Sequence, residues 1–177
     1  MNRLTLISII VTIGVLSRTV FHINNNIEFI TALTLATAYF VKDIKVSVLS
    51  TLGILLISDL IIGNTNIFLF TWSGFLLMVL VGKALKSSNI KSRFVASETG
   101  AIISTLLFFF WTNFGVVVTT SMYSKDISGL IQSYQNGLPF LLNQLIGNLI
   151  IVPVVFFAFD YLLNKRDKFD LKSYNKI

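Results

Sequence analysis

The sequence predicts an all-α membrane protein of six transmembrane helices, with both termini on the cytoplasmic side. Of its 177 residues, 54% are hydrophobic and 12% are charged, whereas soluble domains carry about 25% charged residues. The apolar residues fall into six runs, close to the roughly 20 residues that a helix needs to cross a bilayer core of about 30 Å. The basic residues gather in alternate connections, as the positive-inside rule requires. Lipid is therefore the expected solvent of this chain.

The six runs are expected to be helices, because the chain has only two prolines and lacks the alternating polar period of a membrane β-barrel. The first run follows Asn2 and Arg3 like a signal peptide, but no small-residue cleavage site follows it, so we expect a membrane helix. The second is short for a span, and the fifth and sixth are long enough to tilt. The runs are Leu4–Phe21, Ile27–Val41, Val46–Ile62, Ile67–Leu85, Phe94–Val118 and Leu138–Leu163.

The charges in the connections predict the orientation. With the N-terminus inside, twelve of the 14 basic residues fall on the inner side, and only Arg18 and Lys125 fall on the outer side. The net charge of +6 is therefore a topology signal, with attraction to anionic lipid as a secondary effect, and we expect no nucleic-acid binding. The predicted protein is a multi-pass protein of the plasma (inner) membrane. It has one six-helix domain at 1–164 and a basic cytoplasmic tail at 165–177.

The three predicted outer connections differ in character. Residues 21–28 include three consecutive asparagines, and Gly63–Asn66 is expected to form a tight turn. In the third connection, Thr119–Gly137, the residues Ile127, Leu130, Ile131 and Tyr134 recur at helical spacing. This pattern predicts an amphipathic helix that lies on the outer surface and ends at Gly137, just before Pro139.

Two charges and one histidine lie near the outer side of the predicted bundle. Arg18 lies about 21 Å into the first helix and Asp59 about 20 Å into the third, and His22 shares the face of Arg18. Charges inside a membrane are rare because each costs several kcal/mol, on the order of 2.5–3.5 by insertion scales. Either Arg18 forms a structural ion pair with Asp59 or reaches to the interface, or these groups line a cavity that opens to the outside.

Polar side chains of the last two helices fall at a similar depth. Trp111 and Asn113 lie at the outer end of the fifth helix, and Asn143, Gln144 and Asn148 lie in the outer half of the sixth. Amides buried in hydrocarbon commonly hydrogen-bond between helices, which is the simpler interpretation of Asn148. A cluster of amides and aromatic rings also describes a small-molecule pocket. Trp72 and Tyr123 are expected to be aromatic anchors at the membrane interface.

Small residues spaced four apart predict close helix packing. Ala32 and Ala36 in the second helix favour either internal packing or docking with another membrane subunit, and Ala96, Gly100 and Ser104 in the fifth favour internal packing.

Catalytic and metal-binding functions find no support in the sequence. It contains no cysteine and a single histidine, and it has no zinc-protease, nucleophile-elbow or phosphate-loop motif. We therefore expect no enzyme activity, no catalytic residue, no metal and no cofactor.

Several segments resemble a family of small uncharacterised prokaryotic membrane proteins. RTVFHINNN (Arg18–Asn26) resembles its RxxxHxxN signature, and SDLIIG (Ser58–Gly63) resembles its SDxxxG. WTNFG (111–115), followed by Tyr123, Gly129–Leu130, Tyr134, LPF (Leu138–Phe140) and Asn143, resembles its third conserved block. The similarity extends from about Arg18 to Phe159, and the family is similar to the substrate-binding (S) components of energy-coupling factor (ECF) transporters.

This resemblance implies an outward-facing pocket on an S-component-like bundle, and docking on a transmembrane coupling subunit that two ATPases drive. Ala32 and Ala36 would form the docking face, and Ile127–Tyr134 would form part of a lid. The ligand would be vitamin-like or another small polar micronutrient. The predicted ligand-binding residues are Arg18, His22, Asn25, Asp59, Trp111, Asn113, Tyr123, Tyr134, Asn143 and Asn148. The alternative is a structural or scaffolding membrane protein, similar to small cell-shape proteins, without transport activity.

Overall fold

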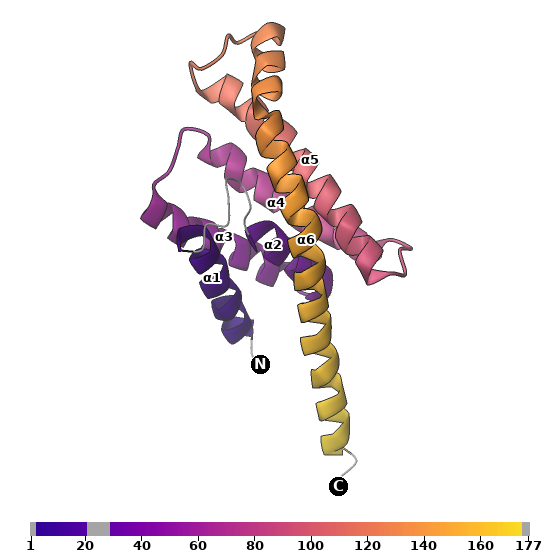
Figure 1. The fold of residues 1–177 in the computed structure, drawn as a ribbon. Helices are drawn as coiled ribbons and strands as arrows, with labels where there is room; N and C mark the ends of the chain where they lie inside the picture. Colours follow the sequence, from indigo (N-terminus) through magenta and orange to yellow (C-terminus); the bar gives the residue numbers. More distant parts are fainter. Residues whose placement is uncertain (1–2, 21–28, 175–177) are drawn as a thin grey trace.

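The computed structural model describes the backbone of residues 3–20 and 29–174, and side chains at 4–20 and 29–163. Helices joined by short connections make up this part of the chain (Figure 1). Each predicted run coincides with one helix, although several ends differ. The helices are α1 (Arg3–Thr19), α2 (Phe29–Phe40), α3 (Ile44–Ile62), α4 (Phe68–Ser87), α5 (Arg93–Thr119) and α6 (Ile127–Tyr174).

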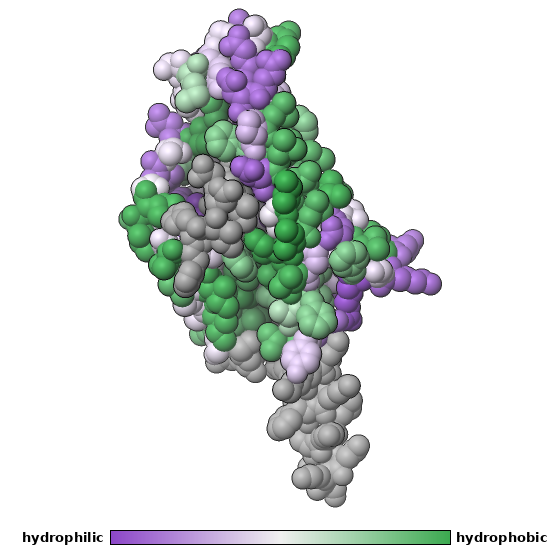
Figure 2. All heavy atoms as spheres, viewed as in Figure 1, coloured by the Kyte–Doolittle hydropathy of each residue, from purple (hydrophilic) through white to green (hydrophobic). Residues whose placement is uncertain are grey.

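The helix lengths and the apolar surface of the bundle support a membrane protein. Within the described residues, four helical segments are long and apolar enough to cross a bilayer, namely α3, α4, α5 and residues Ile127–Leu163 of α6, whereas α1 and α2 are shorter. Large apolar side chains are exposed around the bundle, for example Leu60 at 79% and Phe157 at 74%. Figure 2 shows them as a broad hydrophobic region over the middle of the molecule. Contiguous apolar surface of this extent marks a face that lies against lipid or protein.

The short helix α2 lies at the centre of the bundle. It contacts each of the other five helices, and every residue from Ile30 to Tyr39 is buried. A helix enclosed by protein does not need the length or the apolar surface of a lipid-facing span. This position explains why α2 has 12 residues and why it carries three buried threonines, Thr31, Thr34 and Thr37.

Glycines allow two of the helix pairs to approach closely. A Cβ on Gly14 of α1 would lie 2.4 Å from the Ile54 side chain of α3, and a Cβ on Gly82 of α4 would lie 2.7 Å from Ala38 Cβ of α2. In α5, the small residues Ala96, Gly100 and Ser104 are buried inside the chain, so the prediction of internal packing for this face is confirmed.

The predicted surface helix after α5 is instead the beginning of α6. This helix starts at Ile127 and continues through Gly137, Pro139 and Pro153, so Gly137 does not end it. In the first turns of α6, Ser133 and Gly137 are buried against α5 and Gly129 is buried against the loop at Ser124, whereas Ile127 and Ile131 are exposed. A Cβ on Gly137 would lie 2.7 Å from the Asn113 side chain of α5. Gly137 therefore allows α5 and α6 to pack closely. The end of α5 and the first turns of α6 project together beyond the other helices (Figure 1).

We predict that Gly82→Ala destabilises the protein. The new methyl group would lie 2.7 Å from Ala38 Cβ and 2.9 Å from the Leu35 carbonyl oxygen, and neither atom can move without shifting α2. Overpacking of this kind costs about 1–3 kcal/mol, which exceeds the helix-propensity gain of at most about 1 kcal/mol. Thermal unfolding in detergent measures the change.

Gly53→Ala is the matched control for this variant. Its Cβ would meet only the Val11 side chain, at 3.0 Å, so a smaller loss of stability is expected. Equal unfolding temperatures for Gly82→Ala and Gly53→Ala would contradict the central packing role of α2.

We also predict that acid loosens the start of α6. The Asp126 carboxylate accepts hydrogen bonds from the Gly129 N–H at 2.8 Å and the Ser124 hydroxyl at 2.8 Å. These bonds, with the Gly129 amide first, lower the pKa of Asp126 below its ordinary value of 3.8. A carboxyl group whose pKa is lower in the folded protein stabilises the folded state at pH values above its unfolded-state pKa. This stabilisation is lost as the pH falls through the folded-state pKa.

Hydrogen-exchange protection of residues 127–134, corrected for intrinsic rates, measures this effect. Protection should fall on acidification in the natural chain. In Asp126→Ala it should be low at neutral pH and change little with acid; an unchanged acid response in this variant would exclude Asp126 as the cause.

Candidate ligand-binding cavity

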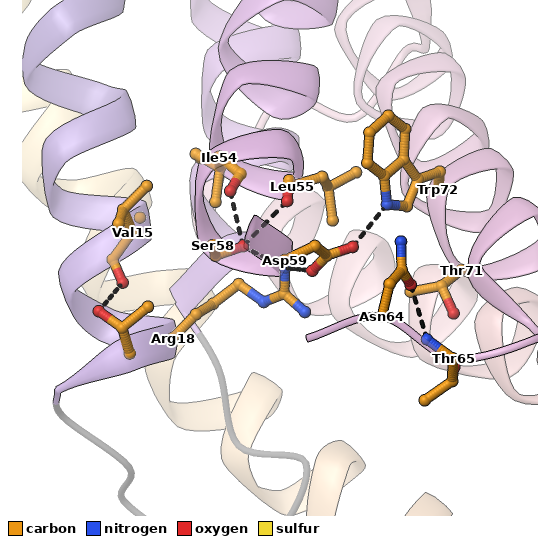
Figure 3. Close-up of polar contacts among 12 residues, drawn as sticks. Val15, Arg18, Ile54, Leu55, Ser58, Asp59, Asn64, Thr65, Thr71 and Trp72 are labelled. Atoms are coloured by element: carbon orange, nitrogen blue, oxygen red, sulfur yellow. Dashed lines mark hydrogen bonds and ion pairs between the residues drawn. The ribbon is translucent and has the colours of Figure 1, made fainter. Parts of the chain in front are cut away.

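An ion pair joins the ends of α1 and α3, and a hydrogen bond adds the beginning of α4. The Arg18 guanidinium donates through Nη1 to Asp59 Oδ1 at 2.8 Å and to the Ser58 hydroxyl at 2.5 Å. The second carboxylate oxygen of Asp59 accepts a hydrogen bond from Trp72 Nε1 at 2.7 Å. Figure 3 shows Asp59 between the guanidinium and the indole. The side chains of Arg18 and Asp59 are only 8% and 9% exposed, so each charge is compensated in a site with little water.

Trp72 makes a hydrogen bond that the prediction of an interface anchor did not include. The sequence suggested an aromatic anchor at the membrane interface, but its ring is half-buried and its N–H is directed at Asp59. A buried carboxylate needs hydrogen bonds to its remaining lone pairs. Trp72 satisfies this need and fixes the carboxylate for Arg18.

Arg18 also lines a cavity of about 290 Å³ beside this ion pair. Five helices contribute to its walls: the end of α1, the beginnings of α2, α4 and α6, and the outer half of α5. The cavity therefore lies among the helix ends that the topology prediction places on the outer side. The lining residues are Arg18, Thr31, Ile67, Thr71, Phe75, Phe108, Phe109, Thr112, Asn113, Gly137, Phe140, Leu141 and Gln144.

Two polar side chains in this wall have no hydrogen-bond partner among the residues that the structure describes. Thr31 is 2% exposed and Gln144 is half-buried, and no described group pairs with either. By contrast, the Thr112 hydroxyl and the Asn113 amide donate to carbonyls of α5, at 2.8 and 2.9 Å. Thr31 and Gln144 are therefore polar groups of the wall that a bound molecule could contact.

Aromatic side chains form most of the remaining wall. Phe75, Phe108, Phe109 and Phe140 face the cavity, and Phe75 packs on Phe108 with ring centroids 4.8 Å apart. Ligand pockets generally combine an apolar, aromatic lining with a few polar groups that fix orientation. This cavity has that composition.

The structure brings some of the predicted site residues to the cavity and places others elsewhere. Arg18 and Asn113 line the cavity. Asp59 is not part of the lining but accepts a hydrogen bond from Arg18. His22 and Asn25 lie outside the described residues. Asn143 is half-buried but is not part of the lining, where the neighbouring Gln144 takes its place.

The other predicted site residues lie away from the cavity. Trp111 donates to the Ser73 hydroxyl at 2.8 Å on an exposed face of α4 and α5. Tyr123 accepts from Asn136 at 3.2 Å in the projecting end, and Tyr134 donates to the Phe110 carbonyl at 3.3 Å. Asn148 is 2% exposed, and its amide donates to the Thr105 hydroxyl at 2.8 Å, which is the interhelical bond that the simpler interpretation expected.

Ala32 and Ala36 are fully buried inside the chain at 0% exposure. Their docking role stays a prediction, and it would require the helices around α2 to move apart.

Several lining residues were absent from the predicted site. Thr31, Thr71 and the phenylalanines resemble the many other hydroxyl and apolar residues of the chain. One usable signal is the spacing of Gly137, Leu141 and Gln144 at i, i+4 and i+7, which puts them on one face of α6. The sequence does not show that this face of α6 points into the bundle. The structure shows it, because Gly137 packs against α5.

The fold and the cavity define a helical membrane protein with a buried ion pair beside a cavity of small-molecule size. The chain belongs to a family of unknown function (DUF6580), which it matches over residues 1–170. No curated protein and no solved structure matches the chain.

We predict that Asp59→Leu is strongly destabilising and that the added change Arg18→Leu restores much of the loss. Removing one partner of a buried pair leaves an uncompensated charge and costs about 3–5 kcal/mol, whereas replacing both by apolar residues is often close to neutral. Unfolding of the single and double variants in detergent measures the coupling. Additive losses, with the double variant less stable than either single, would contradict this account of the pair.

Proposed function

We propose that this protein is the substrate-binding subunit of an ECF-type importer, which captures a small polar or vitamin-like molecule from outside the cell. The observation that supports this most is the cavity, because its largely apolar wall contains the Arg18 guanidinium, the Thr31 hydroxyl and the Gln144 amide. A few polar groups in an apolar, aromatic wall are what a small-molecule pocket needs to orient its ligand.

The dimensions of the cavity support a small ligand. Its volume of about 290 Å³ lies at the lower end of the roughly 300–1,000 Å³ typical of ligand pockets. The phenylalanine rings suit a flat apolar body, and the hydroxyl and amide groups suit polar substituents at its edge. Arg18 is held in place by Asp59 and Ser58 before any ligand arrives, so little ordering is needed on binding.

Release of the ligand to the cytoplasm would depend on partner subunits in this proposal. The sequence has no phosphate-loop motif, so energy would come from ATPases acting through a transmembrane coupling subunit in the plasma membrane. The four long apolar helical segments fit a subunit embedded beside such a partner.

The experiment is native mass spectrometry of gently extracted protein, with Gln144→Leu and Thr31→Val as variants. Both replacements keep the approximate shape of the side chain and remove the hydrogen-bonding groups. We expect the natural chain to carry a bound small molecule, and the two variants to lose most of it while they keep the unfolding temperature of the ligand-free natural chain. A coupling subunit and ATPases that co-purify would support the importer assignment.

Gln132→Leu is the matched control, because it makes the same chemical change at an exposed position in the projecting end. It should retain the ligand. If the natural chain carries no small molecule, and its unfolding temperature does not shift with any member of a vitamin panel, the importer proposal fails and the scaffolding alternative gains support.

A further inference from the structure

A second cavity lies at the opposite end of the bundle, between the beginning of α5 and the later part of α6. It is a groove of about 130 Å³, with Arg93, Phe94, Pro153, Phe157 and Asp160 in its walls. We call it the basic groove, because the connections at this end carry most of the basic residues of the helical domain. It shares no lining residue with the cavity beside Arg18.

Aromatic rings hold two cations near one carboxylate at this end. Arg93 forms an ion pair with Asp160, and its guanidinium lies 5.8 Å from the centroid of the Phe40 ring. Lys86 Nζ lies 5.1 Å from the centroid of the adjacent Tyr39 ring. Cation–π contacts of this length are attractive. Arg93 and Lys86 are therefore two cations that the described structure places against these rings.

The Arg93 side chain remains accessible despite its ion pair. It is 49% exposed, whereas Asp160 is 27% exposed. An arginine guanidinium has five N–H donors, so a bond to one carboxylate leaves capacity for a further anion. A phosphate group could therefore bind Arg93 while Asp160 keeps its contact, although the two anions compete.

The other walls of the groove are apolar and face outward. Phe94 is 65% exposed and Phe157 is 74% exposed, and both belong to helical segments that are long and apolar enough to cross a membrane. A free phosphate ion would not cover these apolar walls. An acyl chain that descends from a phosphate at Arg93 would cover them.

We propose that the basic groove binds an anionic phospholipid, with its phosphate on Arg93 and an acyl chain against Phe94 and Phe157. Basic pockets between transmembrane helices on the cytoplasmic side are suited to anionic headgroups. A zwitterionic lipid gains less, because its ammonium group meets Arg93 and Lys86. The bound lipid holds α5 and α6 together at the basic end. This inference does not depend on the importer proposal.

The experiment measures lipid binding to the full-length protein in detergent by native mass spectrometry, with phosphatidylglycerol and phosphatidylcholine of matched acyl chains. We expect phosphatidylglycerol to bind more tightly. Arg93→Gln should weaken its binding about fivefold, as expected for one basic contact near a membrane surface. Asp160→Asn should strengthen it, because the competing carboxylate is gone. These opposite shifts cannot both arise from general loss of fold.

Lys45→Gln is the matched control, since it removes one positive charge at the same end of the bundle. Lys45 lies in α3, which makes no contact with α5 or α6 in the described part of the chain. Its phosphatidylglycerol binding should equal that of the natural chain. Equal binding of the two lipids, or equal weakening by Arg93→Gln and Lys45→Gln, would overturn the proposal and leave only a general attraction to negative charge.

Discussion

The buried pair of Arg18 and Asp59 is the interaction on which the outer half of the structure depends. A single charge at this depth would cost several kcal/mol, on the order of 2.5–3.5 by insertion scales, so neither residue is tolerable without the other. Their contact brings α1 to α3, and Trp72 brings α4 to the same carboxylate. Because the guanidinium is fixed between Asp59 and Ser58, it forms a stable wall. The cavity lies beside this compensated charge, with Arg18 in its wall.

The centre of the bundle also contains buried polar groups, and these are mainly hydroxyl groups. Thr37 donates to the Leu33 carbonyl at 2.6 Å and Thr105 to the Ala101 carbonyl at 2.7 Å, each within its own helix. Such bonds satisfy a hydroxyl without a partner on another helix, so small polar residues can be buried wherever close packing needs them. Thr31 is buried among these residues and also lines the cavity.

Much of the fold could be predicted from the sequence, because hydrophobic run length marks helices directly when lipid is the solvent. The depth of Arg18 and Asp59 followed from counting residues along those helices. The rotation of each helix could not be predicted in this way, since the lipid-facing and core-facing sides are equally apolar. For this reason the prediction named Trp111 and Asn143 together with Asn113, whereas Asn113 and the unnamed Gln144 line the cavity. The continuity of α6 was missed because Gly137 is a packing residue here.

The arrangement of helices explains why the cavity and the groove have different characters. Within the described residues, α1 contacts only α2 and α3, whereas α5 packs extensively on α6. The basic groove lies within the α5–α6 pair, so its shape is set by one interface. The cavity has Arg18 on α1, Thr31 on α2 and Gln144 on α6, so its shape depends on several helix interfaces at once. Because α1 reaches the rest of the bundle through α2 and α3 in the described residues, a molecule that bonds to all three side chains would add a direct link between α1 and α6.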